Sequence, residues 1–179
     1  MFASGSQNLL HTAARFGVNH AVLLSIVNVD RSAYSYYRAK AAQERSYQDS
    51  PLETRIVRTT QFHDFLTSIF QRGTRLGFVP APAKISFQPI AVSDVANILI
   101  DAAEGQGAAD SIRTVGGPKV ESSRDLAEQW KAATGARGAI VGTRITGALG
   151  STWRAGENLV PEQAIDGVDY AEWLTSIEA

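Results

Sequence analysis

Two continuous apolar segments in the first third of the chain have the pattern of buried strands. Residues 21–27 are apolar at six of seven positions and rich in branched side chains, which is typical of a parallel strand covered on both faces. Residues 54–60 and 111–115 predict a second and a third strand. Apolar residues recur at helical spacing between and around these segments, which predicts helices over residues 6–16, 36–47 and 62–70.

The middle of the chain is less regular. Residues 78–83 are turn-rich and predict a connector without secondary structure. Residues 85–92 predict a short strand, which Pro89 restricts to the edge of a sheet. Ser93 is placed to cap the helix that follows.

Strand and helix alternate along the chain, which predicts an α/β fold with a mainly parallel sheet. The right-handed crossover rule predicts that residues 21–27, 54–60 and 111–115 form neighbouring parallel strands. We expect the strand over 54–60 to be central in space as well as in sequence.

Composition excludes several classes of protein. The 179 residues include 17 basic and 18 acidic side chains, so no basic excess favours nucleic-acid binding. Cysteine is absent, which excludes disulfides and thiolate metal sites, and three scattered histidines predict no metal centre. No apolar run is long enough to span a membrane and no secretory signal is evident, so we expect a cytoplasmic protein.

Ser25, Tyr36 and Lys40 form the sharpest candidate for chemistry. Tyr36 and Lys40 are four residues apart on a predicted helix and therefore share one face. Ser25 lies towards the end of the preceding strand, where open parallel sheets bind ligands. A nearby lysine favours the phenolate and makes a tyrosine a better acid or base. A serine hydroxyl can donate to a carbonyl oxygen that gains charge.

Other residues have structural interpretations beside functional ones. The Tyr-x-x-x-Lys spacing also arises by chance, so its position after the strand with Ser25 gives it weight. His63 could face a substrate or be structural. Arg58 could approach a ligand phosphate, although a salt bridge is the simpler interpretation. We expect the three tryptophans to pack in the core.

Several segments resemble the NmrA-like branch of the atypical short-chain dehydrogenase/reductases. The run HAVLLSIVNVDRSAYSYYRAKAAQE is followed by TRIVRTTQFHDF, FQPIAVSDVA, VGGPKVESSRDLAEQW and YAEWL. The resemblance extends in order over essentially the whole chain. It implies a partial Rossmann-like parallel sheet with flanking helices and a small C-terminal substrate-side region. Residues 1–120 would be the incomplete dinucleotide-binding part, and residues 121–179 the helical substrate-side part.

The resemblance also implies a site and a cofactor. Ser25, Tyr36 and Lys40 match the catalytic trio of the superfamily, in which the lysine also binds the ribose of NAD(P). Residues Thr59, Thr60, Gln61 and Phe62 would lie near the nicotinamide. The ancestral activity would be hydride transfer to a carbonyl or quinone-like small molecule. The alternatives are a regulator that senses nucleotides without turnover, and an inactive remnant.

Family members begin with a strand and a glycine-rich turn of the kind TGxxGxxG, and this sequence contains no complete copy of it. Residues 146–150 have part of the pattern, but we interpret them as a connector into a late helix. Such a turn binds phosphate through backbone amides, so we expect NAD(P) binding to be weak or lost. The strand over 21–27 would also lack a neighbour on one side. An apolar edge of this kind favours self-association, helped by exposure of Leu9, Leu10 and Phe16.

Overall fold

A three-stranded parallel sheet organises the first part of the fold. The computed structural model describes residues 2–105 and 111–177. Strands β1 (His20–Ile26), β2 (Glu53–Thr59) and β5 (Ile112–Val115) pair in the order β1-β2-β5. Both pairs are parallel, with Ile26 opposite Thr59 and Thr59 opposite Val115. The α/β class is therefore confirmed, and so is the prediction of three neighbouring strands with the second in the centre.

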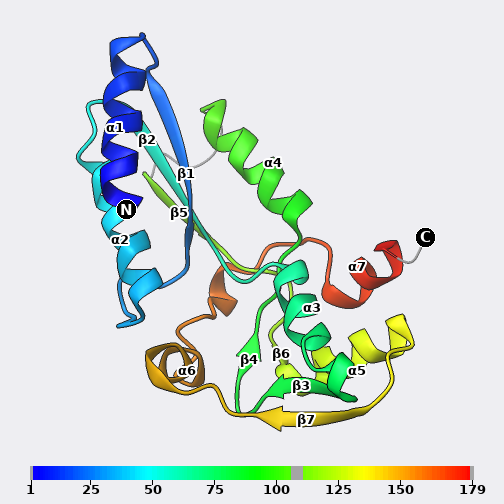
Figure 1. The fold of residues 1–179 in the computed structure, drawn as a ribbon. Coiled ribbons are helices and arrows are strands. Elements are labelled where there is room, and N and C mark those ends of the chain that lie inside the picture. Colours follow the sequence, from blue (N-terminus) through cyan, green and yellow to red (C-terminus); the bar gives the residue numbers. More distant parts are fainter. Residues whose placement is uncertain (1, 106–110, 178–179) are drawn as a thin grey trace.

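Helices cover both faces of this sheet (Figure 1). Helices α1 (Phe2–Arg15) and α2 (Ser35–Gln48) lie on one face, and α4 (Val92–Ala103) lies on the other. Successive residues of β2 point to opposite faces, so Ile56 packs under α1 and α2 while Val57 packs under α4. Burial on both faces explains why the strands are nearly continuous in apolar residues.

The rest of the chain builds a smaller region beyond the carboxyl ends of the main strands (Figure 1). Strand β3 (Phe78–Pro82) pairs parallel with β7 (Ala139–Thr143), and β4 (Ser86–Phe87) pairs antiparallel with β6 (Glu121–Ser122). The helical elements are α3 (His63–Gln71), α5 (Ser123–Thr134), α6 (Gly147–Arg154), α7 (Tyr170–Ile177) and two 3-10 turns, η1 (Thr74–Leu76) and η2 (Pro161–Gln163). Among the described residues, no helix has the length and apolar character needed to cross a membrane.

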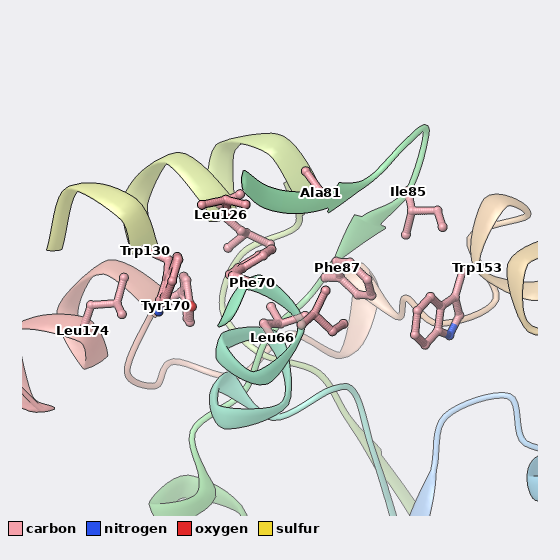
Figure 2. Packing of buried hydrophobic residues seen from close by; sticks show 13 residues of the cluster. Leu66, Phe70, Ala81, Ile85, Phe87, Leu126, Trp130, Trp153, Tyr170 and Leu174 are labelled. Atoms are coloured by element: carbon pink, nitrogen blue, oxygen red, sulfur yellow. The ribbon is translucent and has the colours of Figure 1, made fainter. Parts of the chain in front are cut away.

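An aromatic core holds this second region together (Figure 2). Phe70 on α3 lies against Trp130 on α5 and Tyr170 on α7, with ring centroids 6.0 and 6.5 Å apart. Trp153 on α6 packs edge-to-face against Phe87 at 5.2 Å. These contacts join residues 66–87 to residues 126–174 in one cluster, which places α6 beside the ends of β1 and β2. A division of the chain at residue 120 stays a prediction.

Residues 78–83 form a strand, and the prediction of an irregular connector was wrong. Pro80 and Pro82 lack the N–H that a sheet needs. In β3 the neighbouring Ala83 N donates to Thr143 O at 2.8 Å, so the alternate prolines turn their nitrogens away from β7. The prolines are tolerated because β7 pairs with one side of the strand.

Three further predictions need correction. The strand expected over residues 85–92 is reduced to two residues, since Pro89 cannot donate to a ladder. Ser93, expected to be the N-cap, lies inside the helix, which begins at Val92 with Ala91 at its N-cap. Leu10 is buried against Leu23, because α1 turns this residue towards the sheet. Leu9 and Phe16 are exposed at 62% and 84%, as expected.

Candidate functional site

A cavity of about 450 Å³ lies at the carboxyl ends of β1 and β2. The ends of the two strands, the start of α2, the start of α3 and one side of α6 form its walls. Carboxyl ends of parallel strands are the usual place for ligands in open α/β sheets. The lining residues are Leu24, Ser25, Ile26, Tyr34, Tyr36, Tyr37, Lys40, Thr59, Thr60, Gln61, Phe62, Phe65, Leu149 and Trp153.

Every residue proposed for the site from the sequence lines this cavity. Ser25 comes from β1, Tyr36 and Lys40 from α2, and Thr59 to Phe62 from the end of β2. The parallel register explains why the ends of β1 and β2 lie together, because Ser25 pairs with Arg58 and Ile26 pairs with Thr59. Helix α2 begins after the carboxyl end of β1, so Tyr36 and Lys40 in its first two turns lie at the same end of the sheet.

Ser25 presents a buried hydroxyl to the cavity. The residue is 3% exposed, and its Oγ has no hydrogen-bond partner among the described residues. A buried hydroxyl without a partner is destabilising, typically by about 1–3 kcal/mol, so it calls for an explanation. The hydroxyl is therefore placed to bind a polar atom of a ligand in the cavity.

The Lys40 ammonium is held in the wall by two oxygen acceptors. Its Nζ donates to Leu24 O at 2.8 Å and to Gln43 Oε1 at 2.6 Å. Burial lowers the pKa of Lys40, and the Glu44 carboxylate one turn along the helix opposes this shift. Lys40 is the one charged side chain among the described residues that line the cavity.

The start of α2 supplies two tyrosines with different environments. Tyr36 is 45% exposed and stands one turn before Lys40 on the same helical face. Tyr37 is buried, and its hydroxyl accepts a hydrogen bond from Trp153 Nε1 at 3.3 Å. Burial raises the pKa of Tyr37. Tyr36 is therefore the more accessible phenol, whereas Tyr37 ties α2 to α6.

The segment after β2 is fixed by hydrogen bonds from other parts of the chain. Thr60 Oγ1 accepts from Gly117 N at 3.2 Å, which joins the ends of β2 and β5. Gln61 Oε1 accepts from Asn158 Nδ2 at 3.4 Å. These two hydrogen bonds connect this wall to Gly117 and to Asn158.

Seven lining residues were not proposed as site residues from the sequence: Leu24, Ile26, Tyr34, Tyr37, Phe65, Leu149 and Trp153. Tyr34 and Tyr37 lie within two residues of Tyr36 in the sequence, so they could have been proposed as site residues together with it. Leu149 and Trp153 come from the weakly patterned C-terminal part of the chain. Trp153 was expected to pack in the core; it does so and lines the cavity as well.

His63 and Arg58 have structural partners. His63 is fully buried outside the cavity, with Nε2 3.0 Å from Val168 O. Arg58 forms a salt bridge with Glu44, as its simpler interpretation predicted. Residues 147–150 form the first half of α6, with Thr146 at its N-cap, so the interpretation of this segment as a connector was wrong.

The fold is similar to that of solved NAD(P)-dependent enzymes. An NADPH-dependent quinone oxidoreductase from Escherichia coli, solved with NADPH, has a TM-score of 0.75 at 12% identity; the match covers 97% of this chain and 71% of that one. The NAD-dependent NDP-hexosamine 5,6-dehydratase TunA, involved in tunicamycin biosynthesis, has a TM-score of 0.68 at 15% identity, covering 97% and 67%. RMD from Pseudomonas aeruginosa, complexed with NADPH, has a TM-score of 0.66 at 15% identity, covering 97% and 70%.

At these identities the similarity shows the fold, a Rossmann-like α/β architecture shared with NAD(P)-dependent reductases and dehydratases. No protein-family model matches the sequence, and no curated protein matches it significantly.

Proposed function

We propose that this chain is an NAD(P)H-dependent reductase of the NmrA-like branch that acts on a carbonyl or quinone-like compound. The observation that carries the proposal is the Ser25 hydroxyl, buried without a partner in the cavity that Tyr36 and Lys40 also line. A hydrogen-bond donor, an accessible phenol and an ammonium in one apolar cavity are the groups that carbonyl reduction requires.

The cavity fits the nicotinamide half of the cofactor. Its walls are mostly aromatic and aliphatic, which suits a planar ring, and Ser25 Oγ offers an unused polar atom. Lys40 and residues Thr59, Thr60, Gln61 and Phe62 would hold this half of NAD(P). When bound, the reduced nicotinamide supplies a hydride. Because the sequence has no complete glycine-rich turn, the pyrophosphate lacks its usual cradle and we expect weak binding.

Ser25, Tyr36 and Lys40 would provide the hydrogen bond, the proton and the positive charge that the reduction also needs. Ser25 donates a hydrogen bond to the carbonyl oxygen of the substrate and stabilises the negative charge that develops there. Tyr36 donates its phenolic proton to the same oxygen. The positive charge of Lys40 favours the phenolate left on Tyr36. A proton from solvent then restores the phenol, because Tyr36 is accessible to water.

The lining favours a neutral, apolar substrate. Phe62, Phe65 and Trp153 offer flat surfaces, and Lys40, whose ammonium already has two acceptors, is the one charged group among the described lining residues. A substrate with a carboxylate or phosphate would bury its negative charge beside a single cation, Lys40, which already donates two hydrogen bonds within the protein. We therefore expect ketones, aldehydes or quinones without ionised groups.

A regulator that senses nucleotides is the second candidate function, because the cavity offers the unpartnered Ser25 hydroxyl to a ligand whether or not turnover follows. A regulator that senses nucleotides needs a cavity and no turnover, and it tolerates weak cofactor binding. Such a protein would bind NAD(P)H in the cavity, and carbonyl compounds would not cause its oxidation.

NADPH consumption by the purified chain tests the proposed function. The assay uses NADPH and NADH at millimolar concentration with neutral quinones, aromatic aldehydes and ketones. We expect slow turnover that Tyr36→Phe reduces about 100-fold or more, while binding of the cofactor changes little. Tyr47→Phe is the matched control, because Tyr47 lies on the same helix outside the cavity.

Two results would contradict reduction by this mechanism. The first is binding of NADPH without consumption of any substrate, which favours the regulator. The second is equal loss of turnover in Tyr36→Phe and Tyr47→Phe, which removes Tyr36 from the chemistry.

A further inference from the structure

A chain of side chains connects helix α1 to the ammonium of Lys40. Gln43 Oε1 accepts from Lys40 Nζ at 2.6 Å, and Gln43 Nε2 donates to Ser6 Oγ at 3.1 Å. Ser6 is buried on α1, and Gln43 lies three residues after Lys40 on α2. The chain therefore runs through the interface between the two helices and ends at the cavity.

The chemistry of the groups fixes the direction of this chain. An ammonium only donates hydrogen bonds, so the Gln43 atom that faces Lys40 must be the carbonyl oxygen. The amide nitrogen then faces Ser6, whose hydroxyl oxygen accepts. Ser6 thus holds the Gln43 amide in the one orientation that serves Lys40.

Lys40 needs such support because its side chain is long and partly buried. Ordering a lysine side chain opposes folding because the side chain loses rotamer freedom. The second acceptor, Leu24 O, belongs to β1. With one acceptor on a strand and one on its own helix, the ammonium is fixed at the cavity wall beside Tyr36.

We propose that Gln43 is a positioning residue, which holds the Lys40 ammonium at the cavity and is itself oriented by Ser6. This inference rests on the proposed function for its catalytic meaning, although the hydrogen-bond chain exists without a cofactor. The other ionisable groups near Lys40 are Glu44, which is paired with Arg58, and the phenols Tyr36 and Tyr37.

Titration of the lysines by NMR tests the proposal on the intact chain without cofactor. The sequence has four lysines, so labelling their ε carbons gives four signals, and replacing each lysine by arginine assigns them: Lys40, Lys84, Lys119 and Lys131. Gln43→Met removes the acceptor at nearly constant volume. We expect its Lys40 titration midpoint to fall by about one pH unit, because a buried ammonium has lost a hydrogen bond.

Two further variants separate positioning from packing. Ser6→Ala should shift the Lys40 midpoint in the same direction by a smaller amount, while Ser6→Thr, which keeps the hydroxyl, should restore it. Gln7→Met is the matched control, since Gln7 is the exposed neighbour of Ser6 on α1. If Gln43→Met does not fold, the Ser6 pair carries the test.

Unchanged Lys40 midpoints in both Gln43→Met and Ser6→Ala would overturn the proposal. So would a shift of the same size in Gln7→Met. Failure of the proposed function would appear elsewhere, as an absence of cofactor binding in the cavity, and would leave these midpoints unaffected. If the chain is active, Gln43→Met should also move the pH profile of kcat in the direction of the Lys40 midpoint.

Discussion

Arg58 on β2 and Glu44 on α2 form a two-pronged ion pair. Arg58 Nε donates to Glu44 Oε1 at 3.0 Å, and Nη2 donates to Oε2 at 2.6 Å. The Glu44 side chain is almost fully buried, and hydrogen bonding to Glu44 is the main reason that the pKa of Arg58 is raised. The pair fastens the helix with Tyr36 and Lys40 to the strand that ends at the cavity.

Breaking this pair should destabilise the protein strongly. Glu44→Gln leaves the partly buried Arg58 guanidinium with only the exposed Asp30 carboxylate, 3.7 Å away, as a counter-charge, and we expect a loss of about 3 kcal/mol in the free energy of unfolding. Urea unfolding at pH 7 measures it. The matched control is Glu128→Gln, which breaks the exposed Arg124–Glu128 pair and should change stability by less than about 1 kcal/mol. Equal small losses in both variants would show that the buried pair does not hold α2 in place.

His63 should make the protein less stable in mild acid. Burial lowers the pKa of His63, although the Val168 carbonyl and the carboxylates of Asp64, Asp94 and Asp169 oppose the shift. Below the ordinary histidine pKa of about 6.5, His63 is therefore protonated in the unfolded chain while it stays neutral in the folded chain. Stability is complete above that value and falls as the pH drops, by at most about 1.4 kcal/mol per pH unit.

Urea unfolding between pH 7.5 and 5.5 tests this dependence. His63→Phe should flatten it, whatever its effect on stability at pH 7.5, whereas His11→Gln, on the exposed surface of α1, should retain it. The same slope in His63→Phe and in the original chain would assign the acid sensitivity to other groups.

The open edge of β1 leads to a prediction about self-association. Asn19 O accepts from Glu53 N, and Val27 N donates to Thr59 O, so the odd positions of β1 face β2. The backbone groups of Val22 and Ile26 then face away from β2, on the side where no strand pairs within the described residues. Exposed Leu9 and Phe16 add apolar surface on the neighbouring α1.

We propose that two copies of the chain associate through this edge. Sedimentation velocity over a wide concentration range should show a concentration-dependent dimer. Val22→Pro removes an N–H that β2 does not use and should shift the protein towards monomer, as should the double change Leu9→Gln and Phe16→Ser. A single monomeric boundary at the highest concentration would contradict the proposal.

The sequence predicted the sheet well because its determinants are local. Residues 21–27, 54–60 and 111–115 are apolar enough to require burial on both faces, and their alternation with helices favours parallel neighbours. Ser25, Tyr36 and Lys40 reached the same cavity for a related reason, since the end of a strand and the start of the next helix always meet. These predictions needed no knowledge of distant contacts.

Distant contacts decide what the sequence did not predict. Leu149 and Trp153 reach the cavity because Trp153 bonds to Tyr37 and packs on Phe87, across more than sixty intervening residues. Residues 78–82 form a strand because β7 pairs with the edge of the strand that carries N–H groups, while the proline nitrogens face the other edge. The chain from Ser6 through Gln43 to Lys40 likewise depends on how two helices pack, which no spacing in the sequence reveals.

Binding of the nicotinamide half in the cavity is the central claim, and one NMR titration tests it directly. NADPH and reduced nicotinamide mononucleotide are added to labelled protein, and backbone amide shifts are followed. Both ligands should perturb Ser25, Lys40 and Thr60, with millimolar dissociation constants within about tenfold of each other, because the proposed site holds only the nicotinamide half of the cofactor. Micromolar binding of NADPH alone, or shifts confined to residues outside the cavity, would contradict the account.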